Sequence, residues 1–314
     1  MEKLRIVFMG TPDFAVGILD AIYQNNYDIV GVITAPDKPA GRGQKISESA
    51  VKKYAVEKNL TLLQPTNLKS EDFLAELKAL NANLQVVVAF RMLPAVVWQM
   101  PKYGTFNLHA SLLPDYRGAA PINWAIINGE KETGVTTFFI DEKIDTGAMI
   151  LHKKATIEDN EYAGELHDKL MNLGKEAVIE TLQLIENKSV AQIQQPIEDT
   201  KTAYKLNKEN TKIDWNKSGK EIYNLIRGLS PYPTAWTNLS HDGKILNIKI
   251  YKAEFEVCEP EHNFMEIVAD KKNLKIAVKD GYIKILSLQF PGKKTTDIQS
   301  FLNGFTFKDD SLFS

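Results

Sequence analysis

Residues 104–129 read GTFNLHASLLPDYRGAAPINWAIING and contain a strand, a loop and a helix in succession. In an extended TFNLHA, successive side chains point to opposite faces, so Asn107 and His109 share one face and the apolar residues beside them take the other. The next segment, SLLPDYRGAAP, holds two prolines and a glycine, which predict an irregular loop before a helical run that ends near Gly129. An amide and an imidazole therefore emerge together at a strand end beside an apolar loop, which is typical of a ligand site.

The residues before this stretch alternate between apolar strands and helical patterns. LRIVFM at 4–9, DIVGVIT at 28–34 and LQVVVAF at 84–90 are continuous apolar runs, as in strands buried on both faces. This alternation predicts a Rossmann-like, mostly parallel sheet with helices on both faces. Ligands bind beyond the carboxyl ends of such strands, where we expect Asn107 and His109.

A long polar connection, APDKPAGRGQKISES at 35–49, follows the second strand. Connections in α/β units usually have about 2–6 residues, whereas this one has two prolines, two glycines and the cations Lys38, Arg42 and Lys45. Two interpretations stay open: a basic finger that closes on phosphate, or a mobile surface loop.

A candidate partner for His109 is Asp145, which lies in a D-T-G turn after the expected strand GVTTFFID at 134–141. From a neighbouring loop, its carboxylate could orient the imidazole. The alternative is an aspartate that bonds its own backbone in the turn, which spacing alone favours.

The C-terminal third of the chain has a different pattern. A polar stretch with few large apolar residues predicts a linker at 189–207, and short alternating strands with HDG and KDG turns predict a small OB-like β-barrel at 208–314. The first domain should then cover 1–188. Residues 201–252 contain ten Lys and Arg against four Asp and Glu, which suggests a polyanion partner, although a solvated basic face is the simpler explanation of charge alone.

Composition excludes several classes of protein. The chain is 44% hydrophobic and 25% charged, and no apolar run approaches the roughly 18 residues of a membrane span. The N-terminus resembles a strand rather than a signal peptide, and the single Cys258 cannot form an internal disulfide, so we expect a cytoplasmic protein. The five histidines lack metal-ligand spacing and no G-x-G-x-x-G follows the first strand, so we expect neither a metal nor a nicotinamide or flavin cofactor.

Three separated motifs together resemble those of the 10-formyltetrahydrofolate-dependent formyltransferases. They are the N-x-H of Asn107 and His109, the SLLPDYRGAAPINWA that follows, and the D-x-x-x-D-T-G that contains Asp145. The loop PDKPAGRGQK and the C-terminal segments IDW, RGLSPYPTAW and GKK are similar to those of the branch that acts on methionyl-tRNA, so the resemblance covers nearly the whole chain. The sequence departs from the family pattern at Phe90 and Arg91, near the expected pterin contacts.

The resemblance implies transfer of a formyl group from 10-formyltetrahydrofolate to the amino group of methionyl-initiator tRNA in translation initiation. We expect a monomer without a metal. The resemblance assigns catalysis to Asn107, His109 and Asp145. It assigns folate binding to Ser111, Leu112, Leu113 and Pro114, and tRNA contacts to Arg42 and Lys45.

The chemistry requires such groups independently of the resemblance. Attack of an amine on a formyl carbonyl places negative charge on its oxygen, and a proton must leave the nitrogen, so an amide donor and an imidazole are both useful. One alternative is a formyltransferase for a small-molecule amine such as a nucleotide sugar or glycinamide ribonucleotide. Another is a non-catalytic tRNA-binding protein with the same fold, against which the intact catalytic motifs argue.

Overall fold

The structure is a computed structural model that describes residues 2–40, 45–196, 201–308 and 310–314, with only the backbone at 39, 40, 45 and 46. Contacts divide the chain into two compact units that interleave along the sequence. The first comprises Met1–Pro121, Glu132–Thr156 and His167–Thr202, and the second comprises Ile122–Lys131, Ile157–Leu166 and Ala203–Ser314. The functional boundaries expected at 188 and 208 stay a prediction.

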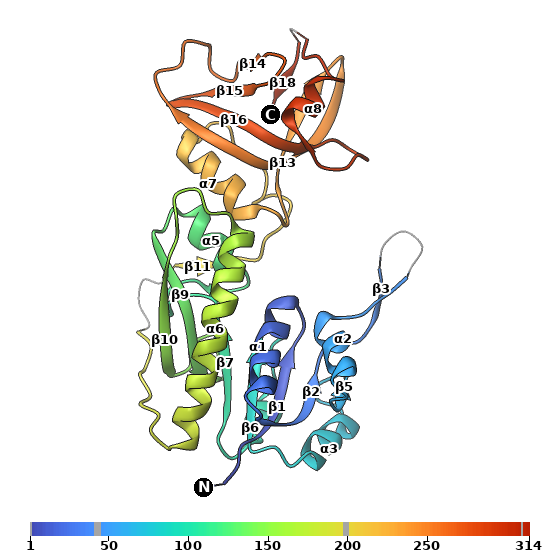
Figure 1. Cartoon of the computed structure of the whole chain (residues 1–314), viewed down its shortest axis with the longest axis vertical. Helices are drawn as coiled ribbons and strands as arrows, with labels where there is room; N and C mark the ends of the chain where they lie inside the picture. Colours follow the sequence, from blue (N-terminus) through green and yellow to red (C-terminus); the bar gives the residue numbers. More distant parts are fainter. Residues whose placement is uncertain (1, 41–44, 197–200, 309) are drawn as a thin grey trace. The chain divides into compact units, whose positions relative to one another are not determined.

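A seven-stranded sheet forms the centre of the first unit (Figure 1). Five neighbouring strands are parallel, and β9 runs antiparallel to both β7 and β10, which confirms the mostly parallel Rossmann-like sheet. In sheet order the strands are β10 (Met149–Thr156), β9 (Glu132–Phe139), β7 (Thr105–His109), β6 (Leu84–Val88), β1 (Arg5–Gly10), β2 (Asp28–Ile33) and β5 (Leu62–Leu63).

Different helices cover the two faces of this sheet. They are α1 (Asp13–Gln24), α2 (Ala50–Glu57), α3 (Glu71–Ala79), α4 (Ala95–Trp98) and α6 (Ala163–Glu186). On one face, Val87 of β6 shares an apolar cluster with Phe73 of α3 and Val97 of α4. On the other, Leu108 lies so close to Gly174 of α6 that an added Cβ there would be 2.8 Å from its Cδ2. The sheet is thus buried on both faces, as its continuous apolar runs predict.

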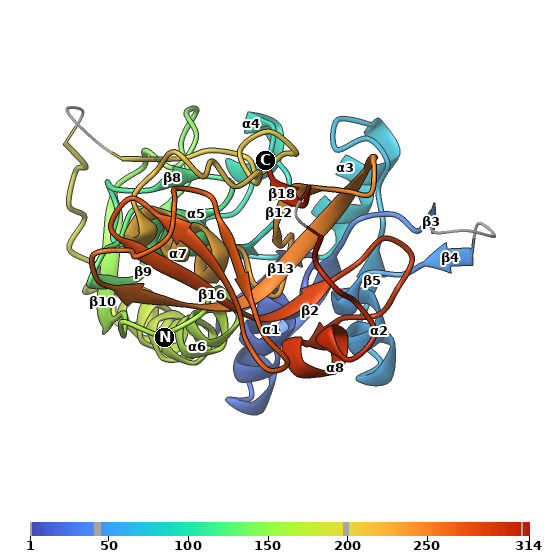
Figure 2. The same cartoon turned by 90° about the horizontal axis from the view of Figure 1, so that it is seen from above.

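The connection between β2 and α2 forms a narrow ribbon of two strands, β3 (Lys38–Ala40) and β4 (Lys45–Ser47). Figures 1 and 2 show it projecting from the first unit. Its base is anchored at Asp37, whose carboxylate accepts hydrogen bonds from Lys52 Nζ and, at 2.8 Å, from Gln64 Nε2. These two hydrogen bonds lower the pKa of the Asp37 carboxyl.

The second unit is a nearly closed antiparallel barrel with a helix against it (Figure 2), which confirms the OB-like expectation. The strands follow the order β14-β15-β16-β13-β12-β18, and β17 pairs with β16. The elements are α7 (Gly219–Leu229), β12 (Ala235–His241), β13 (Lys244–Val257), β14 (Ile267–Ala269), β15 (Leu274–Val278), β16 (Gly281–Gln289), β17 (Thr296–Asp297), α8 (Ile298–Leu302) and β18 (Leu312–Phe313). At the β12–β13 turn, Asp242 and Gly243 both have positive φ, at 52° and 69°, as the HDG signal predicts.

Three further elements are α5 (Pro121–Ile127), β8 (Arg117–Gly118) and β11 (Thr202–Ala203). Within the second unit, the buried Arg227 of α7 donates hydrogen bonds to the backbone carbonyls of Glu158 and Glu161. Burial lowers the pKa of Arg227. These contacts explain why the segment Ile157–Leu166, from the middle of the chain, belongs to the barrel unit.

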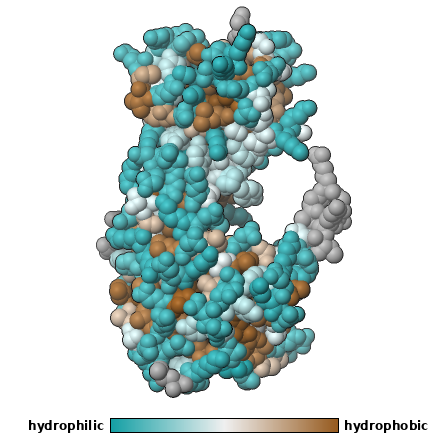
Figure 3. Space-filling view, viewed as in Figure 1, coloured by the Kyte–Doolittle hydropathy of each residue, from teal (hydrophilic) through white to brown (hydrophobic). Residues whose placement is uncertain are grey.

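No helix in the described part of the chain is long and apolar enough to cross a membrane. On the face of the first unit that Figure 3 shows, hydrophobic residues are interspersed with hydrophilic ones.

Candidate functional site

His109 is the last residue of β7, and only 6% of its surface is exposed. Its Nε2 lies 2.8 Å from the backbone carbonyl oxygen of Tyr116. Because a carbonyl oxygen can only accept, Nε2 carries a proton and donates, and in the neutral ring Nδ1 is then unprotonated. Nδ1 is therefore the ring atom that can accept a further proton.

Asp145 faces this second nitrogen. Its Oδ2 lies 3.9 Å from His109 Nδ1, which is within ion-pair distance but beyond a hydrogen bond. The same oxygen accepts a 2.9 Å hydrogen bond from the backbone N–H of Gly118. In the turn itself, the capping aspartate is Asp141, which accepts hydrogen bonds from Lys143 N and Thr146 Oγ1. The structure therefore brings Asp145 and His109 together and assigns the local turn role to another residue.

Asn107 lies on the same sheet face as His109, two residues earlier in β7. It is in register with Val87 of β6, so its side chain shares the face that α3 and α4 cover. The side chain is half-buried, and no hydrogen bond joins its carboxamide to another described residue. Its N–H donors and its carbonyl oxygen are thus available to a ligand.

The loop after β7 is held by Thr136 of β9. The Thr136 hydroxyl donates to the Ser111 carbonyl at 2.7 Å and accepts from Leu113 N at 3.1 Å. The Ser111 hydroxyl donates to the carbonyl of Asp115 at 2.6 Å, and Leu113 is buried with Phe138. Of the four residues predicted to bind folate, Ser111 and Leu113 therefore direct their side chains into the protein.

The other two predicted folate-binding residues, Leu112 and Pro114, are half-buried, and the bond between Leu113 and Pro114 is cis. The side chain of Leu112 lies near the backbone of Gly134 in β9, where an added Cβ would be 2.5 Å from Leu112 Cδ2. Folate contacts by the four loop residues stay a prediction.

Two further polar residues at this site, Arg117 and Gln195, are not predicted from the sequence. The guanidinium of Arg117 donates to Gln195 Oε1 at 2.7 and 3.1 Å and to the Asp145 carbonyl at 3.1 Å. Gln195 is buried, although it lies in the segment expected to be a linker. The surrounding sequence, SVAQIQQP, is polar and aperiodic, so no pattern distinguishes Gln195 from an exposed neighbour.

The predicted tRNA contacts cannot be placed in the same way. Arg42 lies outside the described residues, and Lys45 is described only by its backbone, as the first residue of β4. Their roles stay a prediction.

The departure from the family pattern at Phe90 and Arg91 has a local structural consequence. Arg91 donates hydrogen bonds to the backbone carbonyls of Pro65 and, at 3.0 Å, Thr66, and its guanidinium lies 5.6 Å from the centre of the Phe90 ring. Partial burial lowers the pKa of Arg91. Arg91 therefore ties the loop after β6 to the loop after β5.

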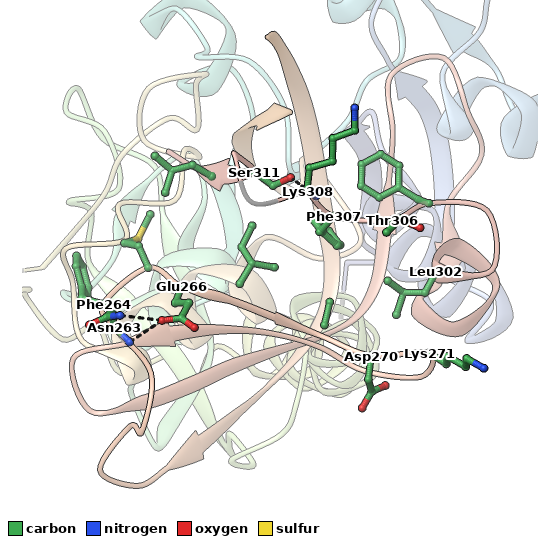
Figure 4. Close-up of a pocket in the computed structure, with 15 residues that line it drawn as sticks. Asn263, Phe264, Glu266, Asp270, Lys271, Leu302, Thr306, Phe307, Lys308 and Ser311 are labelled. Carbon is green, nitrogen blue, oxygen red and sulfur yellow. Dashed lines mark hydrogen bonds between the residues drawn. The ribbon is translucent and has the colours of Figure 1, made fainter. Parts of the chain in front are cut away.

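A groove of about 770 Å³ lies in the second unit beside β14 and β18, the two edge strands of the barrel (Figure 4). Its lining includes Phe264, Leu302 and Phe307, and Asn263 donates hydrogen bonds to Glu266 at its border. It contains none of the predicted site residues. Among the described residues, no group of three or more His, Cys, Asp or Glu side chains could hold a metal ion.

Comparison with known families gives two matches along the chain. Residues 4–182 match the model of the formyl transferase family, and residues 205–306 match the model of the formyl transferase C-terminal domain.

Curated relatives match the chain over its full length. A methionyl-tRNA formyltransferase of Flavobacterium johnsoniae is 68% identical over 99% of both chains. One of Bacteroides thetaiotaomicron is 52% identical over 98% of both chains.

Among solved structures, the sugar 3N-formyl transferase WlaRD, determined in the presence of dTDP and 5-N-formyl-THF, is 22% identical with a TM-score of 0.65. It covers 94% of this chain and 100% of its own, a likeness that concerns the fold. The chain belongs to the formyl transferase family.

Proposed function

We propose that the chain transfers the formyl group of 10-formyltetrahydrofolate to the amino group of methionyl-initiator tRNA, in the cytoplasm and as a monomer. The observation that carries this assignment is the full-length similarity, at 52–68% identity, to relatives named methionyl-tRNA formyltransferase. The buried polar site of the first unit supplies the chemical groups that this reaction needs.

Asn107 stabilises the developing oxyanion. As the amine attacks the formyl carbon, negative charge grows on the formyl oxygen, and the free carboxamide of Asn107 can donate a hydrogen bond to it. A preorganised donor of this kind contributes about 3–4 kcal/mol to the transition state. Its position in the middle of the central strand β7 favours preorganisation, because the backbone there is fixed by pairing on both sides.

His109 and Asp145 handle the proton. The bond between the formyl carbon and the folate nitrogen breaks as the new bond to the amine forms, and the proton lost by the amine is returned to the folate nitrogen. Nδ1 of His109 can accept a proton in this exchange, and the carboxylate of Asp145 at 3.9 Å stabilises the resulting cation. The Nε2 hydrogen bond to Tyr116 keeps the ring in the orientation that this role requires.

Folate binds beside these residues, along the loop of Ser111, Leu112, Leu113 and Pro114. The hydrogen bonds from Thr136 fix the backbone of this loop, so it offers a preformed apolar edge to a flat pterin.

The second unit supplies a basic surface for tRNA around Trp236 of β12. The Nζ atoms of Lys208 and Lys212 lie 5.4 and 5.7 Å from the centre of the Trp236 ring. Lys249 of β13 lies directly opposite Trp236 in the register of the two strands. None of these three lysines has an ion pair within the described part of the chain, unlike Lys275, which pairs with Glu256. Uncompensated ammonium groups around an aromatic ring suit the phosphates and bases of RNA.

In this proposal, residues 1–188 perform catalysis, residues 208–314 bind tRNA, and the linker at 189–207 joins the two. The 38–47 ribbon adds a contact to tRNA through Arg42 and Lys45. Hydrogen bonds from Lys52 and Gln64 to Asp37 anchor the base of this ribbon. An anchored base would hold the ribbon in one direction, as a specific contact with tRNA requires.

One assay tests the assignment. The protein is incubated with 10-formyltetrahydrofolate and, in parallel reactions, methionyl-initiator tRNA, a dTDP-amino sugar or glycinamide ribonucleotide. We expect formylation of the tRNA and at most trace reaction of the small amines. Faster formylation of a small amine would contradict the proposed substrate, and no formylation of any amine would contradict the enzymatic role.

A further inference from the structure

The geometry points to Gln195 as a positioning residue for Asp145: its side-chain amide fixes the turn that directs the carboxylate toward His109. This inference rests on the proposed function, because it takes Asp145 and His109 as the proton-handling pair. Gln195 itself does not face the imidazole and is not a catalytic residue.

Every hydrogen-bonding position of the Gln195 carboxamide is used. Its Nε2 donates to the backbone carbonyls of Asp145 at 3.0 Å and of Gly147 at 2.8 Å. Its Oε1 accepts both hydrogen bonds from Arg117, at 2.7 and 3.1 Å. Gln195 is 9% exposed, so these bonds are shielded from competing water.

The Asp145 turn needs such support. Asp145 has a φ of +55°, in the left-handed region that non-glycine residues seldom adopt. The residues before it pack poorly, since Ile144 is 59% exposed. After it, the chain passes so close to β9 that an added Cβ at Gly147 would lie 1.7 Å from the Phe139 carbonyl oxygen. The two carbonyls that Gln195 binds belong to the residue with the unusual φ and to the residue at this close approach.

Gln195 also acts on the carboxylate through Arg117. The guanidinium of Arg117, held by Gln195, donates to the Asp145 carbonyl, and the next residue, Gly118, donates its N–H to Asp145 Oδ2. Gln195 and Arg117 therefore both hold the backbone carbonyl of Asp145, while the N–H of Gly118, in the strand that also contains Arg117, holds its carboxylate.

The position of Gln195 is itself fixed. Two residues earlier, Ile193 exchanges backbone hydrogen bonds of 2.8 and 2.9 Å with Met149 of β10. This bridge connects Gln195 to the central sheet, so the carboxamide is presented from a rigid element.

The test uses the full-length protein and formyl transfer to methionyl-initiator tRNA. Gln195→Ala removes all four hydrogen bonds, and Gln195→Glu keeps the side-chain volume and the Arg117 contact but cannot donate to the two carbonyls. We expect both to lower kcat by about 10- to 100-fold with KM for tRNA changed less than about twofold. The matched control is Gln194→Ala, because Gln194 is exposed and has no side-chain hydrogen bond to another described residue. It should retain wild-type kcat.

A double-mutant cycle separates positioning from general destabilisation. If Gln195 acts through Asp145, then Gln195→Ala added to Asp145→Asn should lower kcat by less than about twofold further, and both single variants should change the pH profile of kcat in the same direction. The inference would be overturned if kcat of the double variant fell by the product of the two single losses. It would also be overturned if Gln195→Glu kept the wild-type pH profile of kcat at unchanged Tm. Wild-type kcat in Asp145→Asn would instead contradict the proposed catalytic role of Asp145.

Discussion

The polar site of the first unit and the basic surface of the second use polar side chains in opposite ways. In the first unit, the His109 ring donates to the Tyr116 carbonyl, the Asp145 carboxylate accepts from the Gly118 N–H, and Gln195 holds the Asp145 backbone. Around Trp236, the ammonium groups have no carboxylate partner among the residues that the structure describes. Fixed, shielded dipoles suit a reaction whose charge develops at one atom, whereas mobile, solvated cations suit a long polyanion. The difference predicts that damage to the two regions will affect different steps and respond differently to salt.

The largest effect should follow loss of the oxyanion donor or the imidazole. We expect Asn107→Ala and His109→Ala each to lower kcat by roughly 100- to 1000-fold, because a preorganised group is removed from a buried site. tRNA affinity, measured by filter binding, should stay within about twofold of wild type. A loss of affinity as large as the loss of kcat would show that these residues mainly bind substrate.

A smaller effect, on tRNA affinity instead of kcat, should follow removal of the basic surface. We expect Lys208→Ala combined with Lys212→Ala to weaken tRNA binding by about tenfold at low salt and to reduce the slope of log K against log salt by about 1.4–1.8, as for two lost phosphate contacts. The control is Lys284→Ala, since Lys284 is already paired with Glu254. An unchanged salt slope in the double variant would remove this surface from the tRNA interface.

A smaller loss, in kcat/KM for tRNA, should follow a substitution at the base of the 38–47 ribbon. We expect Asp37→Asn to reduce kcat/KM for tRNA by about two- to fivefold without changing the rate at saturating tRNA, because the ribbon would lose its defined direction. Steady-state kinetics at fixed folate measure this. A fall in kcat with unchanged KM would show that the ribbon acts on chemistry instead.

The smallest effect should appear in stability at acidic pH. Hydrogen bonds from Lys52 and Gln64 lower the pKa of Asp37 from its usual 3.8, so its contribution to stability is complete above that value and is lost as the pH falls through the lower, folded-state pKa. The Tm difference between wild type and Asp37→Asn should therefore be constant from pH 5 to about 8, begin to shrink as the pH falls below about 4, and be lost as the pH falls through the lower, folded-state pKa. A Tm difference that grows at acidic pH would contradict the predicted lowering of the Asp37 pKa by its hydrogen bonds.

Where a pattern repeats along the chain, the sequence predicted the structure well. Alternation in TFNLHA placed Asn107 and His109 on one face, because side chains in a strand have a period of two. Continuous apolar runs predict buried parallel strands, and the resemblance to the formyltransferases, rather than the spacing, assigns Asp145 to the site of His109, where it lies 3.9 Å from the ring. Spacing alone would have assigned Asp145 to its own turn, the role that Asp141 performs.

The remaining features depend on contacts that leave no local pattern. Gln195 binds backbone carbonyls of residues that lie about fifty positions earlier, and a carbonyl is present at every residue, so no residue type marks the partner. The connection at 35–49 is predicted from its length and composition as a basic finger or a mobile loop, and neither interpretation includes the two three-residue strands, Lys38–Ala40 and Lys45–Ser47, that pair there. The hydrogen bonds at its base join Asp37 to Lys52 and Gln64, which lie 15 and 27 residues later, so no local pattern marks them.

The most direct test of the central claim is the single-turnover rate of formyl transfer to methionyl-initiator tRNA, at saturating folate and enzyme and at two salt concentrations. If the His109 site performs chemistry and the Trp236 surface performs binding, His109→Ala should slow this rate equally at both salts, and the Lys208 and Lys212 double variant should react at the wild-type rate once saturated. A saturated rate that is normal in His109→Ala, or equally slow in both variants, would contradict the account.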